Sequence, residues 1–159
     1  MKTALRLFLF AIAAAAFAMQ TECATPRHRH AAAKAQKARP KGWSEADAPG
    51  YARDVLHWVN VERKKRGLRP LRLSQNCQGH AQKRSREITK RFSHKGCFRG
   101  FRGYRCKGEN IAKGFRSGRA VVNAWMRSKG HRANILSKRY QHLGVGRTGN
   151  AWVQIFGGR

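Results

Sequence analysis

Among the side chains that could do chemistry, Glu109 stands out as an isolated acid in a basic chain. After Glu87 it is the only Asp or Glu in the rest of the sequence, and Lys and Arg residues surround it. Neighbouring cations favour the charged form of a carboxyl group, so we expect Glu109 to be ionised. Such a carboxylate serves either a functional site or a structural salt bridge, and its isolation does not decide between them.

Two histidines lie where helices are expected to begin or end. His94 follows Phe92-Ser93 at the end of one predicted helix, and His131 follows Gly130 at the start of a short helical turn. Taken singly, each is more often a structural or exposed histidine than a ligand. The other histidines of the predicted folded region lie outside any motif: His57, His80 and His142.

Signatures of several enzyme classes are missing from the sequence. There is no His-Glu-x-x-His helix, no Gly-x-Ser-x-Gly elbow and no phosphate-binding loop. The two aspartates, Asp47 and Asp54, both lie in the N-terminal third. A Ser-His-Asp triad would have to take Asp54 from the first helix, which we do not expect.

Apolar residues at helical spacing predict three main helices. The first starts near Tyr51 and stops before Gly67, because Pro70 prevents continuation. Ser74 can cap the second helix, and the third is expected at about 119–128. A Gly-rich loop is expected from His94 to Gly108. The residues expected to face inward are Tyr51, Val55, Trp58 and Val59; then Cys77, Ala81, Ser85 and Ile88; then Val121, Val122, Trp125 and Met126.

The C-terminal region follows a different pattern. Gly130 is expected to break the third helix, with a helical turn continuing to Leu136. Apolar residues then alternate along two segments, around Val145 and Val153, on either side of Thr148-Gly149-Asn150, which predicts an antiparallel hairpin. Helices first and strands late favour an α+β domain with helices packed on a small sheet.

The N-terminal region predicts export. Lys2 precedes an apolar run from Leu5 to Ala18 that only Arg6 interrupts, and Ala16-Phe17-Ala18 matches the small-x-small pattern that signal peptidase cleaves. Residues 1–18 are therefore predicted to be a signal peptide, with cleavage possible as late as residue 24. A membrane anchor is the alternative, but the run is short for a bilayer. Residues 19–50 are poor in large apolar side chains and are predicted to be a disordered basic linker. The folded domain is predicted to span 51–159.

Charge and cysteine content limit the partners and the compartment. The formal charge is +28, from 35 Lys and Arg against 7 Asp and Glu, which indicates polyanionic partners. Four cysteines in an exported chain indicate disulfides. Cys97 and Cys106 share one loop and are the pair we favour, with Cys77 bonded to Cys23 or left as a thiol. No Cys-x-x-Cys pair supports a cysteine zinc site.

Six segments in order resemble the motifs of bacterial CAP domains (SCP/PR-1-like; cysteine-rich secretory protein, antigen 5, pathogenesis-related 1). The resemblance extends from about Tyr51 to Gly157 and implies an α–β–α sandwich with a small antiparallel sheet between helices and a central cleft. The segments are Asn60–Arg63 with Gly67–Leu71, Phe92–His94, Gly108–Ala112, Ala124–Leu136, Tyr140 with Gly144–Gly146, and Gln154–Gly157.

The resemblance also implies a binding cleft lined by His94, Glu109, Ser128 and His131. In many members two histidines and two glutamates line this cleft, and in some the histidines hold zinc or another divalent ion. His94 and His131 match the histidines and Glu109 matches the first glutamate, whereas Ser128 stands at the position of the second. Two imidazoles and a carboxylate could ligate a divalent ion with an open water position.

Three functions are compatible with this sequence. We favour a secreted or periplasmic binding module for a small lipid-like ligand or a divalent ion. A metal-dependent, peptidase-like hydrolase is the enzymatic alternative, with His94, Glu109 and His131 as catalytic candidates. The third is a protein that adheres to anionic envelope polymers or lipid headgroups through its basic surface. Specific nucleic-acid recognition is not expected, nor is a transmembrane segment after signal cleavage.

Overall fold

The computed structural model describes residues 22–23 and 43–159, in which helices enclose a central sheet. The strands are β1 (Glu22–Cys23), β2 (Arg72–Leu73), β3 (Cys106–Lys113), β4 (His142–Thr148) and β5 (Ala151–Gly158). Their order in the sheet is β1-β3-β5-β4-β2. All neighbours are antiparallel except β2 and β4, so the small sheet is mixed where an antiparallel one was expected.

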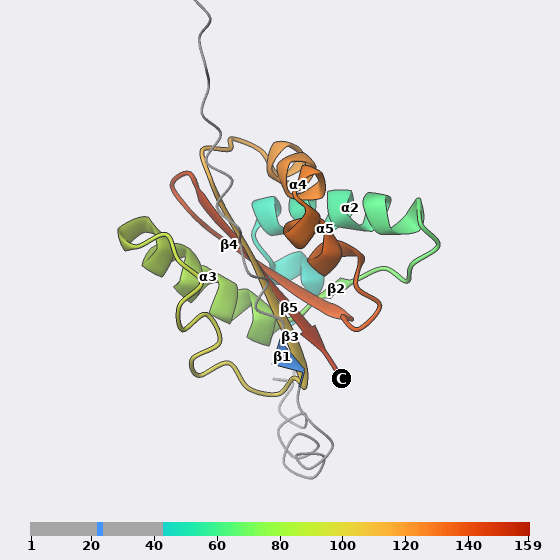
Figure 1. Cartoon of the computed structure of the whole chain (residues 1–159), viewed down its shortest axis with the longest axis horizontal. Helices are drawn as coiled ribbons and strands as arrows, with labels where there is room; N and C mark the ends of the chain where they lie inside the picture. The colour runs from blue at the N-terminus through green and yellow to red at the C-terminus, as the bar shows by residue number, and fades with distance from the viewer. Residues whose placement is uncertain (1–21, 24–42) are drawn as a thin grey trace, which may run out of the picture.

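Helices cover both faces of this sheet (Figure 1). They are α2 (Gly50–Lys64), α3 (Gln75–Lys90), α4 (Gly118–Arg127) and α5 (Lys129–Leu136). One apolar cluster lies between α3 and the sheet and includes Ile88, Val153 and Ile155. A larger cluster on the other face includes Val59 and Trp125 and joins α2, α4 and α5 to the sheet. The predicted α+β fold, an α–β–α sandwich, is confirmed.

Two boundaries differ from the sequence prediction. Gly130 lies within α5, and the chain instead breaks at Ser128, whose extended backbone both ends α4 and precedes α5. The folded part also begins before Tyr51: Glu45–Asp47 form a 3-10 helix, and the next residue, Ala48, is buried. The predicted signal peptide and most of the predicted linker lie outside the described residues. None of the described helices is long and apolar enough to cross a bilayer.

The predicted Cys97–Cys106 disulfide is wrong. Cys97 and Cys77 are buried thiols. The loop carries Cys97 beneath α3, where its carbonyl oxygen lies 2.6 Å from His80 Nε2. Cys106 lies instead at the start of β3, where the backbone of Cys23 is its partner across the sheet.

Candidate functional site

Glu109 lies on β3, a strand that the sequence pattern did not predict. Strand β1 pairs only with the first two residues of β3, Cys106 and Lys107, so from Gly108 onward one side of β3 has no strand partner among the described residues. Because side chains alternate along a strand, Glu109 and Ile111 share one face of the sheet. Ile111 belongs to the cluster beneath α3, so Glu109 also faces α3.

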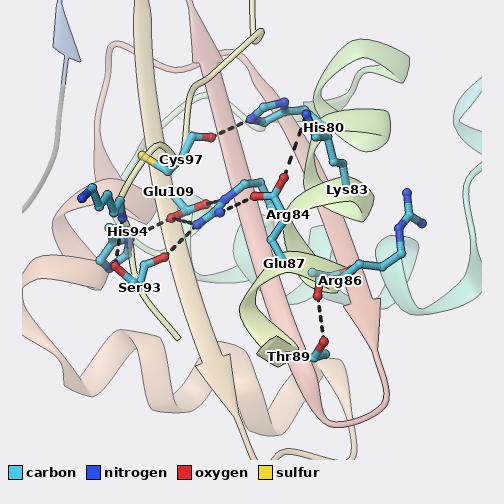
Figure 2. Close-up of polar contacts among 12 residues, drawn as sticks. His80, Lys83, Arg84, Arg86, Glu87, Thr89, Ser93, His94, Cys97 and Glu109 are labelled. Carbon is cyan, nitrogen blue, oxygen red and sulfur yellow. Dashed lines mark hydrogen bonds and ion pairs between the residues drawn. The ribbon is translucent and has the colours of Figure 1, made fainter. Parts of the chain in front are cut away.

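Arg84 from α3 binds the Glu109 carboxylate in a buried ion pair (Figure 2). Its Nε donates to Oε2 at 2.8 Å, and Nη2 donates to Oε1 at 3.3 Å. The two side chains expose only 5% and 1% of their surface. Arg84 also donates to the Ser93 carbonyl and pairs with Glu87. Burial by itself would lower the pKa of Arg84, but its bonds to Glu109 and Glu87 outweigh that effect and raise it.

His94 binds the same carboxylate from the loop that follows α3. Its Nδ1 lies 2.8 Å from Glu109 Oε1. An ionised carboxylate accepts hydrogen bonds only, so Nδ1 carries the proton and donates. Glu109 therefore fixes both the orientation and the tautomer of His94, as carboxylates do for many functional histidines.

His131 approaches this group from α5 and is half-buried. Burial lowers its pKa, and the charge of His94 lowers it further. Both effects favour the neutral imidazole at pH 7. The cluster thus combines a histidine held by a carboxylate with a second, neutral histidine.

A buried amide network on the other face of β3 ties α5 to the sheet. Asn134 Nδ2 donates to the Glu109 carbonyl at 3.2 Å and to Asn110 Oδ1 at 2.9 Å. Asn110 Nδ2 in turn donates to Gln154 Oε1 on β5 and to the His131 carbonyl. These bonds place His131 relative to β3 through the backbone of α5.

The structure joins some of the predicted site residues directly and places others by their elements. His94 and Glu109 are in contact, and His131 lies close enough for His94 to shift its pKa. Ser128 lies at the junction of α4 and α5, where its carbonyl accepts from Arg132 N. Arg84 was missed, although its position was informative: it lies three residues after Ala81 and four before Ile88, on the inward side of α3.

The side chains present do not fit a three-ligand metal site. Both oxygens of Glu109 accept hydrogen bonds from Arg84, and Oε1 also accepts from His94. A guanidinium this close opposes a cation at the same carboxylate. Within the described ranges no group of three His, Cys, Asp or Glu side chains is arranged to hold a metal ion.

A basic hollow of about 310 Å³ adjoins the cluster on the α3 side. Arg84 and Ser93 belong to its wall and link it to Glu109 and His94. Ion pairs with Glu87 and Glu109 partly neutralise Lys83 and Arg84. Three further cations of the wall form no ion pair with a described Asp or Glu: Arg91, Lys95 and Arg99.

Comparison with known families assigns the fold. The model of the cysteine-rich secretory protein family, CAP, matches residues 56–156. The chain belongs to this family. The matched region of this CAP domain contains His94, Glu109, Ser128 and His131, and also Arg84.

Two proteins of Bacillus subtilis are among its relatives. The chain is 34% identical to YkwD of Bacillus subtilis (strain 168) over 142 residues, which cover 81% of this chain and 55% of YkwD. It is 45% identical over 49 residues to the membrane protein YlbC of the same organism, covering 31% of this chain and 14% of YlbC. The chain thus spans about half the length of YkwD.

Solved structures agree on the architecture. An extracellular protein containing an SCP domain from Bacillus anthracis str. Ames superposes with a TM-score of 0.64 at 28% identity, covering 69% of this chain and 41% of that one. A cysteine-rich secretory protein from Staphylococcus aureus Mu50 has the same fold, with a TM-score of 0.64 at 23% identity, covering 71% and 40% of the two chains.

Proposed function

We propose that this CAP-domain protein is an exported binding module for a small amphipathic anion. The observation that carries the proposal is the basic hollow beside the Arg84–Glu109–His94 cluster. Its cations that have no acidic partner among the described residues, including Arg91 and Lys95, suit a carboxylate or phosphate head group. This refines the lipid-like ligand expected from the sequence, because the wall of the hollow is cationic.

An apolar contact for the rest of such a ligand is available next to the hollow. Phe92 is the one large hydrophobic side chain that is exposed among the described residues, at 42%. It lies between Arg91 and Ser93, which both belong to the wall. Lys113 Nζ lies 5.4 Å from the centre of its ring. An anionic head at the cations and an apolar tail on Phe92 satisfy both surfaces.

Calorimetric titration tests this function with decanoate below its micelle concentration, and with decanol as the uncharged ligand of equal chain length. Decanoate should bind the wild type at least tenfold more tightly than decanol. The triple variant Arg91→Gln, Lys95→Gln, Arg99→Gln should lose that preference. The triple Arg69→Gln, Arg72→Gln, Lys138→Gln removes the same charge elsewhere and should retain it. Equal binding of decanol and decanoate, or equal losses in both triples, would refute the proposal.

Export and a disulfide form the second part of the proposal. The β1–β3 register sets the backbones of Cys23 and Cys106 opposite each other. Cys77 and Cys97 are thiols and Cys106 is disulfide-bonded, so we propose Cys23 as its partner. Oxidising compartments permit such a bond. Alkylation in denaturant without reductant should modify two cysteines of the secreted protein, and four after reduction; four before reduction would rule the bond out.

A further inference from the structure

A second concave surface lies away from the Glu109 cluster, beneath the turn that joins α2 to β2. Its volume is about 710 Å³, within the range of small-molecule sites, and it shares no wall residue with the first hollow. Five Lys or Arg residues belong to its wall, together with His142, and no Asp or Glu does. The five cations are Arg63, Arg69, Arg72, Lys138 and Arg159.

The charge of this surface has no acidic counterpart in the described part of the chain. None of its five cations forms an ion pair with a described Asp or Glu side chain. The first hollow differs, because Glu87 and Glu109 offset part of its charge. A concave surface lined by one sign of charge concentrates its field and raises the local concentration of counter-ions.

Arg63 gives this surface a fixed charge at its base. The residue is 2% exposed. Its Nε donates to the Arg69 carbonyl at 2.8 Å, and Nη1 donates to the carbonyls of Ile135 and Ser137 at 2.7 and 2.9 Å. These bonds satisfy N–H donors of Arg63, but no described carboxylate pairs with its positive charge. A guanidinium held this way remains protonated, since Arg is not deprotonated in proteins.

The composition of the wall indicates the class of ligand. Apart from the buried Arg63, three of the four cations are Arg, whose planar fork binds oxyanions through two parallel hydrogen bonds. Several cations around one volume call for a ligand with more than one negative charge. Linked phosphoryl groups supply that charge in a short length of chain. Arg69, Arg72 and Lys138 are exposed and able to reach such a chain.

We propose that this Arg-rich hollow between the α2–β2 turn and the start of β4 is a binding site for a soluble phosphoryl chain, a ligand with at least two linked phosphoryl groups. The site is separate from the cluster at Glu109 and does not depend on the function proposed for that cluster. Together, the two sites would let one molecule hold a small anion and a polymer segment at the same time.

The test uses inorganic tripolyphosphate as the probe, titrated into the full chain at 150 mM salt without divalent cations. The triple variant Arg69→Gln, Arg72→Gln, Lys138→Gln should bind it at least thirtyfold more weakly than the wild type. The matched triple Arg91→Gln, Lys95→Gln, Arg99→Gln removes the same charge from the first hollow and should stay within threefold of wild type. All six positions are exposed, and thermal unfolding checks that both variants are folded.

Three results would overturn the proposal. The first is equal weakening in the two triples, which would indicate diffuse attraction to the whole surface. The second is wild-type affinity for monophosphate as high as that for tripolyphosphate, which would remove the requirement for linked groups. The third is binding to phosphatidylglycerol vesicles without binding to tripolyphosphate, which would assign the surface to a membrane.

Discussion

A carboxylate as buried as Glu109 is stable in this protein because several charged or polar donors bind it. Arg84 supplies two hydrogen bonds and His94 a third, while the remaining donors of Arg84 bind Ser93 and Glu87. A buried ion pair is tolerated only when such bonds offset the cost of removing both charges from water. The same contacts that stabilise Glu109 therefore also orient His94.

Replacing Glu109 with Gln should destabilise the fold by about 3–5 kcal/mol, since it leaves the Arg84 charge buried against a neutral amide. Glu62→Gln is the control: Glu62 pairs with Lys65 and Arg66 on the surface, where such pairs contribute about 0–1 kcal/mol. Urea unfolding with an unchanged m-value measures both. A loss below about 1 kcal/mol for Glu109→Gln would contradict the buried ion pair.

Two histidines should make the protein less stable in mild acid. Burial lowers the pKa of His80 and of His131 below the usual histidine value of 6.5. As the pH falls through 6.5, the unfolded chain takes up protons first, so the free energy of unfolding decreases until the folded histidines are protonated too. Urea titrations between pH 7.5 and 5 should show this decrease. The double variant His80→Gln, His131→Gln should show a smaller decrease in the free energy of unfolding over this pH range. The control variant His57→Gln, at an exposed position, should show the same decrease as the wild type.

At the scale of elements, the backbone of α3 lies directly against β4. A Cβ atom on Gly144 would lie 2.0 Å from the Cys77 backbone carbon, and one on Gly146 would lie 2.0 Å from the Ala81 carbonyl oxygen. Only glycine allows this approach, which seats α3 so that Arg84 reaches Glu109. The sequence pattern showed the strand but gave no sign of the contact, because it depends on two segments far apart in the chain.

Gly144→Ala and Gly146→Ala should each cost more than about 3 kcal/mol, at or above the upper end of the overpacking range, since the obstructing atoms are backbone. Gly79→Ala is the matched control within α3. Its Cβ would meet nothing within 4 Å, so it should stabilise the helix by about 0.5–1 kcal/mol. Thermal unfolding compares the three. Near wild-type stability of Gly146→Ala would show that α3 can move away from β4 without penalty.

At the scale of the whole molecule, local patterns predicted the helices and the hairpin well, whereas long-range pairing was harder to foresee. The apolar face of α2 and the turn at Gly149 follow from neighbouring residues. The motif Gly108–Ala112 drew attention to Glu109, yet the strand that carries it was missed because glycine and polar residues interrupt the alternation that marks a strand. Arg84 was missed for a related reason. From sequence alone an arginine is predicted to be exposed, and its burial becomes clear only when its acidic partner is known.

The charge of +28 is also a property of the whole chain. The acidic side chains that could compensate this charge already form hydrogen bonds or ion pairs within the domain. These contacts join Glu45 with Leu73, Asp47 with Ser44, Asp54 with Gly118, Glu62 with Lys65 and Arg66, and Glu87 and Glu109 with Arg84. Much of the surface charge is therefore not compensated by acids in the described part of the chain.

A long polyphosphate chain should accordingly bind with a strong dependence on salt, because its many contacts release counter-ions from the chain. Between 50 and 200 mM salt we expect its affinity to fall by at least about 100-fold. Tripolyphosphate makes fewer contacts and should give a shallower slope of log Kd against log salt. Removing three charges from either hollow should reduce the polymer slope by a similar small amount, because a long chain also contacts cations outside both. Fluorescence anisotropy of labelled polymer measures these slopes. A polymer slope no steeper than that of tripolyphosphate would mean that binding is confined to one hollow and that the remaining surface charge makes no contribution.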